Sequence, residues 1–160
     1  MSILINRISI EDEDTSPQAQ LIERDRKIAL RDIKETCHFI PFEDQKPPYN
    51  IDLSIEENRL VFRIQNAENK DLPTLVLALK PYRRLVKDYF MIVRSYDEAI
   101  KNGNPSKIEA IDMGRRAVHN EGAELLMERL EDKIEMDMDT ARRLFTLICV
   151  LHAGKAHILR

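Results

Sequence analysis

The sequence of 160 residues has no tryptophan, only four glycines and only two cysteines. Two cysteines, Cys37 and Cys149, are too few for a disulfide framework, so we interpret them as free thiols in a reducing compartment. Scarce glycine and the absence of low-complexity tracts argue against long disordered segments. The longest apolar-rich run, Leu144–Leu151, is far shorter than the ~20 residues that span a membrane.

The amino-terminal segment MSILINRISI lacks the basic start and long apolar stretch of a secretory signal. Hydrophobic residues make up 43% of the chain, which is enough to build one core at this length. We therefore expect a single domain over residues 1–160, located in the cytoplasm and not associated with a membrane.

The net charge of −3 conceals a segregation of charge along the chain. Basic residues outnumber acidic ones from Lys80 to Arg116, and acidic residues dominate from Glu121 to Asp139. Opposite blocks pair either within one molecule or between copies. We favour pairing within the molecule, and a homo-oligomer is the alternative.

Residues 1–80 are predicted to contain one helix and several antiparallel strands. Alternating apolar residues predict the strands Ile3–Ile10, Ile51–Ile55, Leu60–Ile64 and Leu75–Leu79. A charged helix is predicted from a capping box at Thr15–Gln18 to about Thr36.

Residues 81–160 are predicted to be mostly helical. The expected helices run from Pro81 to the Gly103-Asn104-Pro105 break, from Ile108 to a break near Asn120 and Gly122, through Leu125–Leu130, and over Thr140–His152 with Asp139 as N-cap. Lys133–Met138 alternates and is predicted to be an edge strand. The last helix is apolar nearly all round, so it should lie in the core. The fold class is therefore α+β, with a small antiparallel sheet of three to five strands packed against a helical C-terminal half.

The segment Ile108–Gly122 carries the densest set of candidate site residues. At about 100° per residue, five polar side chains share about a third of the helix circumference. They are Glu109, Asp112, Arg115, Arg116 and His119. This stripe is either the lining of a site or a solvated face joined by ion pairs, and both interpretations stay open. Gly114 lies on the opposite, apolar arc, which favours close helix packing there.

If the stripe lines a site, then Asp112, His119 and Glu121 are the candidate catalytic residues. Carboxylates beside an imidazole suit general acid–base chemistry, and Arg115 or Arg116 would hold an anionic substrate with Asn120 nearby. The corresponding activity is a hydrolase or transferase acting on a phosphate-containing metabolite. Whether the protein is an enzyme stays open.

Three arginine pairs, Arg83-Arg84, Arg115-Arg116 and Arg142-Arg143, are candidate anion-binding groups. If two pairs converge they form a phosphate or sulfate site, and otherwise they serve ion pairs between helices. A basic ridge of Arg83, Lys87, Arg94 and Lys101 on the outer side of the second helix is best explained as a solvated face.

The favoured function is a non-catalytic binding or regulatory protein that recognises an anionic partner. That partner is an acidic protein surface, a phosphorylated ligand or RNA, and RNA is the least favoured because the pI is 5.9 and no nucleic-acid motif is present. We expect no cofactor and no metal. Cys37-His38 and Cys149-x-x-His152 supply zinc-type ligands without the usual spacing.

Four blocks of the sequence resemble a known family. They are Arg59–Phe62, Pro81–Ile92, Ile108–Gly122 and Asp139–His152. They are similar to the uncharacterised protein family number 0262 of the UPF series, which consists of short alphaproteobacterial proteins. The resemblance covers roughly Leu21 to His152. The tail departs from the family, whose members tend to carry a tryptophan where this chain has Ala153. The family has no established activity, cofactor or catalytic residue, so the resemblance implies a cytoplasmic bacterial protein and nothing more specific about function.

Overall fold

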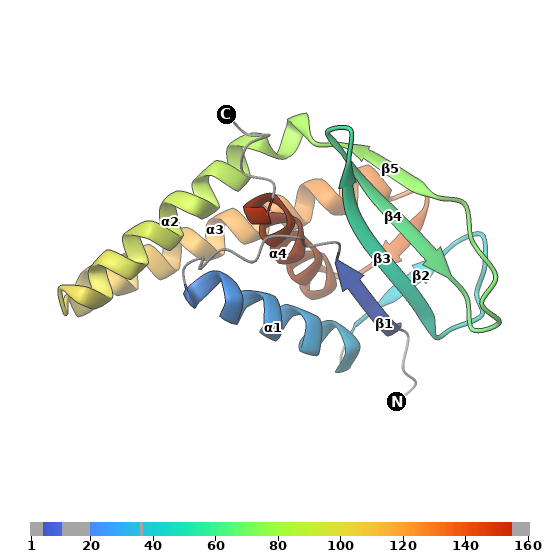
Figure 1. Ribbon diagram of the computed structural model, residues 1–160, viewed down its shortest axis with the longest axis horizontal. Coiled ribbons are helices and arrows are strands. Elements are labelled where there is room, and N and C mark those ends of the chain that lie inside the picture. The colour runs from blue at the N-terminus through green and yellow to red at the C-terminus, as the bar shows by residue number, and fades with distance from the viewer. Residues whose placement is uncertain (1–4, 11–19, 36, 155–160) are drawn as a thin grey trace.

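A computed structural model describes residues 5–10, 20–35 and 37–154, and it places a small sheet beside a group of helices (Figure 1). The strands are β1 (Ile5–Ile10), β2 (Phe39–Pro41), β3 (Tyr49–Glu56), β4 (Arg59–Gln65), β5 (Leu75–Ala78) and β6 (Ile134–Met136). The helices are α1 (Gln20–Glu35), α2 (Arg83–Lys101), α3 (Pro105–Leu130) and α4 (Met138–Gly154), with a 3-10 turn at Lys80–Tyr82 before α2. The predicted α+β class is confirmed. The expected capping box at Thr15–Gln18 lies outside the described residues.

The larger sheet has the strand order β1-β3-β4-β5. Neighbouring strands from β3 to β5 are antiparallel, as expected, but β1 pairs parallel with β3, so this sheet is mixed. Parallel neighbours need a crossover connection, and α1 lies within it. The β3–β4 hairpin turns through Glu57 and Asn58, both of which have positive φ (52° and 62°), a combination typical of tight hairpin turns.

The predicted strand between α3 and α4 is confirmed as β6, but it does not join the larger sheet. It pairs antiparallel with β2, a short strand that the sequence did not indicate. The backbone N–H of His38, just before β2, also donates to Oγ1 of Thr140 in α4 at 2.9 Å. The chain after α1 is therefore tied to the turn between the last two helices.

Two helix boundaries differ from the sequence-based expectation. The helix predicted to break near Asn120 and Gly122 is continuous over the whole of α3. The first turn of α4 is capped by Asp137, whose Oδ1 accepts from the backbone N–H of Thr140 at 2.9 Å, so Asp139 is not the cap.

The two helical glycines of α3 have different surroundings. A Cβ on Gly122 would lie 2.4 Å from ring carbons of Phe145, so glycine is what allows α3 and α4 to approach closely. A Cβ on Gly114 would meet no atom within 4 Å. The expectation of close packing at Gly114 was therefore wrong, and the close contact occurs eight residues later, at Gly122.

Helix α4 occupies the middle of the molecule, between α1 on one side and the α2–α3 pair on the other (Figure 1). Every residue from Leu144 to Leu151 is buried, as the apolar sequence of this helix predicts. A single hydrophobic core includes side chains from α4, from the other helices and from the sheet. None of the described helices has both the length and the apolar character needed to cross a membrane.

Candidate functional site

A buried carboxylate joins three helices next to α4. Asp25 of α1 is only 5% exposed. Its Oδ2 accepts from the hydroxyl of Tyr89 in α2 at 2.8 Å, and its Oδ1 accepts from Nη2 of Arg115 in α3 at 2.6 Å. A buried carboxylate is costly unless it is paired and hydrogen-bonded, and these two partners meet that requirement. Asp25 therefore fixes where the guanidinium of Arg115 lies.

The imidazole of His119 lies beside this cluster. It is 9% exposed and packs edge-on against Tyr89 (ring centroids 5.8 Å apart) and against Phe145 of α4 (5.6 Å). Its Nδ1 is 2.9 Å from the backbone carbonyl oxygen of Arg115. A carbonyl oxygen only accepts, so Nδ1 carries the hydrogen of this bond.

The same ring is neutral near neutral pH. Burial lowers the pKa of His119 below its usual value of 6.5, and the positive charges of Arg115 and Arg142 act in the same direction. With the hydrogen on Nδ1, Nε2 is an acceptor. This Nε2 is buried and has no hydrogen-bond partner in the part of the chain that the structure describes, and the same holds for Nε of Arg115.

A hollow of about 370 Å³ opens beside these residues. It is lined by Arg115, Arg116, His119 and Asn120 of α3 and by Arg142 of α4. Oδ1 of Asn120 accepts from Nε of Arg142 at 2.7 Å, which links the two helices at the rim. Members of two of the three arginine pairs thus converge on one place.

Each of the three guanidiniums also meets a carboxylate. The pairs are Arg115 with Asp25 at 2.6 Å, Arg116 with Asp112 at 3.0 Å, and Arg142 with Asp139 at 2.6 Å. The side chains of Asp112 and Asp139 are 39% and 66% exposed, and such solvent-screened pairs contribute only about 0–1 kcal/mol. An incoming anion therefore competes with two weak pairs, while Arg115 stays held by its buried partner.

The other two candidate catalytic residues do not surround the imidazole. Asp112 is paired with Arg116 and borders a smaller cleft of about 150 Å³ with Asp25 and Arg115. Glu121 is exposed and accepts from Nη2 of Arg84 at 2.8 Å. Two residues along a helix correspond to about 200°, so Glu121 projects away from His119.

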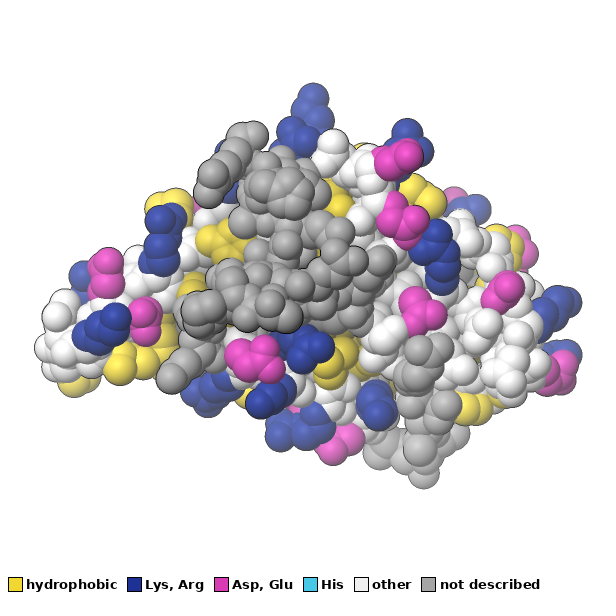
Figure 2. Space-filling view, viewed as in Figure 1, with side chains coloured by type: hydrophobic (Ala, Val, Ile, Leu, Met, Phe, Trp, Pro, Cys, Tyr) yellow, Lys and Arg dark blue, Asp and Glu magenta, His cyan; other side chains and the backbone are white. Residues whose placement is uncertain are grey.

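The remaining sequence candidates lie on the outer surface of α2. Arg83, Lys87, Arg94 and Lys101 are exposed, which fits a solvated face. Arg84 bonds to Asp88 of its own helix and to Glu121 of α3, an example of pairing within the molecule. Figure 2 shows Lys and Arg side chains interspersed with Asp and Glu over the visible face. Charge that is segregated along the chain is therefore mixed on this surface.

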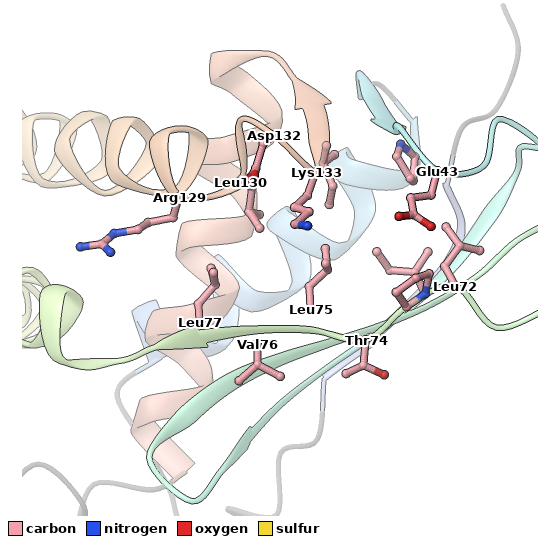
Figure 3. Close-up of a pocket in the computed structure, with 14 residues that line it drawn as sticks. Glu43, Leu72, Thr74, Leu75, Val76, Leu77, Arg129, Leu130, Asp132 and Lys133 are labelled. Atoms are coloured by element: carbon pink, nitrogen blue, oxygen red, sulfur yellow. The ribbon is translucent and has the colours of Figure 1, made fainter.

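A second hollow of about 410 Å³ lies between β5 and the chain connecting α3 to β6 (Figure 3). Leu75 and Leu77 point into it, and Thr74 and Val76 point away, as alternation along a strand requires. The charged residues that line it are Glu43, Asp132, Arg129 and Lys133. The two acidic side chains offset the two basic ones, so the lining of this second hollow does not favour an anionic ligand as the arginines of the first hollow do.

The sequence contained one overlooked indication of the site. Asp25 follows Ile22 by three residues and precedes Ala29 by four, so it is a charged residue on the buried side of α1. The hydroxyl of Tyr89 is buried against this carboxylate. The thiol of Cys149 is fully buried, which raises its pKa and makes it unsuitable as a nucleophile. Within the described part of the chain, no three His, Cys, Asp or Glu side chains are arranged to hold a metal ion.

Comparison with known proteins gives consistent matches over most of the chain. The model of UPF0262, an uncharacterised protein family, matches residues 3–154. A UPF0262 protein of Rhizobium etli is 52% identical over 131 residues, which cover 82% of this chain and 83% of that protein. A UPF0262 protein of Brucella canis is 51% identical over 142 residues, covering 88% and 89%. No solved structure is significantly similar to the chain. The chain therefore belongs to the UPF0262 family of uncharacterised bacterial proteins.

Proposed function

We propose that this protein is a cytoplasmic binding or regulatory protein that holds a small phosphorylated or phosphate-like anion in the hollow between α3 and α4. One observation carries the proposal. Three guanidiniums line the hollow, and two buried polar atoms of the same residues, Nε2 of His119 and Nε of Arg115, have no partner among the described residues. A buried polar atom without a partner costs about 1–3 kcal/mol, so a ligand that supplies partners recovers that free energy.

The shape of the hollow supports a small ligand over the other anionic partners. Ligand pockets are usually concave spaces of roughly 300–1,000 Å³, and this one lies at the lower end of that range. An acidic protein surface or an RNA backbone needs an extended exposed basic face. The basic ridge on α2 is interrupted by acidic neighbours such as Asp88 and Asp97. Oδ2 of Asp97 lies 3.5 Å from Nζ of Lys101 and forms an ion pair with it.

Calorimetric titration with inorganic phosphate and pyrophosphate tests the proposal. Arg116→Gln and Arg142→Gln should each weaken binding by roughly tenfold or more, because each removes a charge-assisted hydrogen bond. Arg94→Gln, on the exposed side of α2, is the matched control and should leave binding unchanged. Absence of binding, or equal losses in all three variants, would contradict the proposal.

A hydrolase or transferase acting on a phosphate-containing metabolite is the second candidate. The neutral His119 with an unprotonated Nε2 favours it, because such an atom can accept a proton from a hydroxyl or water while arginines hold the phosphate. Asp112 would then position Arg116, and the proton-accepting role would fall to His119 alone. Turnover of phosphate esters that disappears in His119→Ala, with sulfate binding retained, would select this candidate over simple binding.

A further inference from the structure

The polar groups that line the hollow offer mostly donors. Guanidiniums donate and cannot accept, so Arg115, Arg116 and Arg142 present only N–H groups. Asn120 uses its Oδ1 to accept from Arg142, which leaves its amide N–H groups as donors. Among the side chains lining the hollow, His119 contributes the one unpartnered acceptor, Nε2.

The hydrogen on the imidazole cannot easily move to Nε2. That shift would turn the lone pair of Nδ1 toward the carbonyl oxygen of Arg115, 2.9 Å away, and two acceptors would then face each other. A second proton would place a positive charge in a buried position near Arg115 and Arg142, which burial and those charges oppose. Nε2 therefore stays an acceptor near neutral pH.

The hydroxyl of Tyr89 is not available to this acceptor. Tyr89 packs against His119, and burial raises the pKa of its phenol well above the usual range, so the phenol keeps its hydrogen. That single hydrogen is already donated to Asp25 at 2.8 Å. Within the described part of the chain no group donates to Nε2, so a molecule that enters the hollow is the remaining source of a donor.

We propose that the ligand of this hollow is an oxyanion that carries a hydroxyl group, with hydrogen phosphate as the simplest case. The arginines and Asn120 hold its anionic oxygens, and its hydroxyl donates to Nε2 of His119. This inference rests on the anion binding proposed above and adds a selectivity that arginines alone do not create.

The selectivity follows from comparing two tetrahedral anions. Sulfate has the shape of phosphate and a similar charge, but it carries no hydrogen near neutral pH. Bound in the same way, one of its oxygens would face the lone pair of Nε2, and two acceptors without a hydrogen between them repel. A ligand that lacks the donor required by a buried acceptor loses far more affinity than a ligand that lacks an apolar contact.

Competition between four ligands at about pH 8 separates the outcomes, because phosphate groups are then mostly doubly charged. The probes are inorganic phosphate, sulfate, methyl phosphate and glycerol phosphate. Binding of inorganic phosphate at least about tenfold tighter than sulfate and methyl phosphate places the donor on the phosphoryl group. Tight binding of glycerol phosphate with weak binding of methyl phosphate places the donor on a neighbouring carbon. Either result supports the inference.

Two other results overturn different parts of the account. If all four anions bind with equal affinity, the hollow binds anions but His119 does not select a donor, and the present inference fails alone. If none of the four binds, the proposed anion binding fails together with it.

His119→Phe removes the acceptor and keeps a ring between Tyr89 and Phe145. The ratio of phosphate to sulfate affinity should fall to about one, without a loss of sulfate affinity. His152→Phe is the matched control, because His152 of α4 is also buried and its Nδ1 is 2.8 Å from the carbonyl oxygen of Ile148. His152 is not among the residues that line the hollow, so this variant should keep the wild-type ratio.

A measurement on the unmodified protein keeps the test independent of variant folding. Nitrogen NMR of the histidine rings should show a protonated Nδ1 and an unprotonated Nε2 for His119. Inorganic phosphate should shift the Nε2 resonance, and sulfate should not. A resonance that shows Nε2 protonated in the free protein would overturn the inference.

Discussion

Asp25 is the residue on which the geometry of the site depends most. It lies about one turn of α1 from the buried apolar residues Ile22 and Ala29. Its carboxylate accepts hydrogen bonds from the hydroxyl of Tyr89 and from the guanidinium of Arg115. Breaking a buried ion pair by removing one partner leaves the other charge uncompensated, which is far more costly than losing an exposed pair. The position of Arg115 in the hollow follows from this single carboxylate.

Asp25→Asn is therefore expected to lower the free energy of unfolding by about 3–5 kcal/mol, since Arg115 would remain half-buried without its anion. Asp112→Asn, which removes the exposed partner of Arg116, should cost less than about 1 kcal/mol. Urea unfolding of the two variants measures the difference. Similar small losses in both would show that Asp25 does not hold the cluster together.

The buried side chains of His119 and His152 predict a dependence of stability on pH. Burial lowers the pKa of both His119 and His152 below the usual 6.5. Below about pH 6.5 the unfolded chain binds protons that the folded protein does not. The contribution of the two neutral histidines to the free energy of unfolding is therefore complete above that pH and decreases as the pH falls toward their pKa values in the folded protein. Each histidine contributes at most about 1.4 kcal/mol per pH unit.

Urea unfolding at about pH 7.5 and about pH 5.5 tests this linkage. His119→Phe and His152→Phe should each lose less stability over that interval than the wild-type protein loses. Carboxylates titrate in both variants as they do in the wild-type protein, so the comparison isolates the histidines. An unchanged pH dependence in both variants would contradict the account.

At the scale of elements, α3 decides how the site is assembled. Its length lets one helix present Arg115, Arg116, His119 and Asn120 while it packs against both α2 and α4. The close approach to α4 occurs at Gly122, where the ring of Phe145 occupies the space that a side chain would need. This contact brings Arg142 of α4 to the rim of the hollow.

Gly122→Ala should destabilise the protein by about 1–3 kcal/mol, because the new methyl group overlaps the ring of Phe145 and the helices must separate. Gly114→Ala should stabilise it by about 0.5–1 kcal/mol, because the same methyl group meets open space and favours the helix. Thermal unfolding of both variants gives the sign of each change. Equal effects would mean that α3 and α4 are not in close contact at Gly122.

Local patterns predicted most elements, and long-range contacts explain the exceptions. Alternation identified β3, β4 and β5, and the apolar sequence of α4 identified its central position, because burial of one face or of all faces leaves a direct trace in the sequence. The parallel pairing of β1, the strand β2 and the role of Gly122 depend on partners distant in the chain. Periodicity around one residue contains no information about such partners.

At the scale of the whole molecule, four helices bring together residues that are far apart in sequence. Asp25, Tyr89 and His119 come from α1, α2 and α3, and Phe145 of α4 packs on His119. Sequence analysis identified the stripe on α3, including Arg115, Arg116 and His119, because charged side chains recur there at helical spacing, and it placed Asn120 nearby. Their convergence with Asp25 and Arg142 required the tertiary structure, as did the finding that Glu121 points away.

The measurement that tests the central claim most directly is a phosphate titration followed by the backbone amide resonances of the protein. Binding in the hollow predicts saturable shifts concentrated in residues 115–120 of α3 and 139–142 of α4. Resonances of the exposed basic residues Arg94 and Lys101 on α2 should change little. Shifts confined to α2, or a response that never saturates, would show that the arginines of the hollow do not form an anion site.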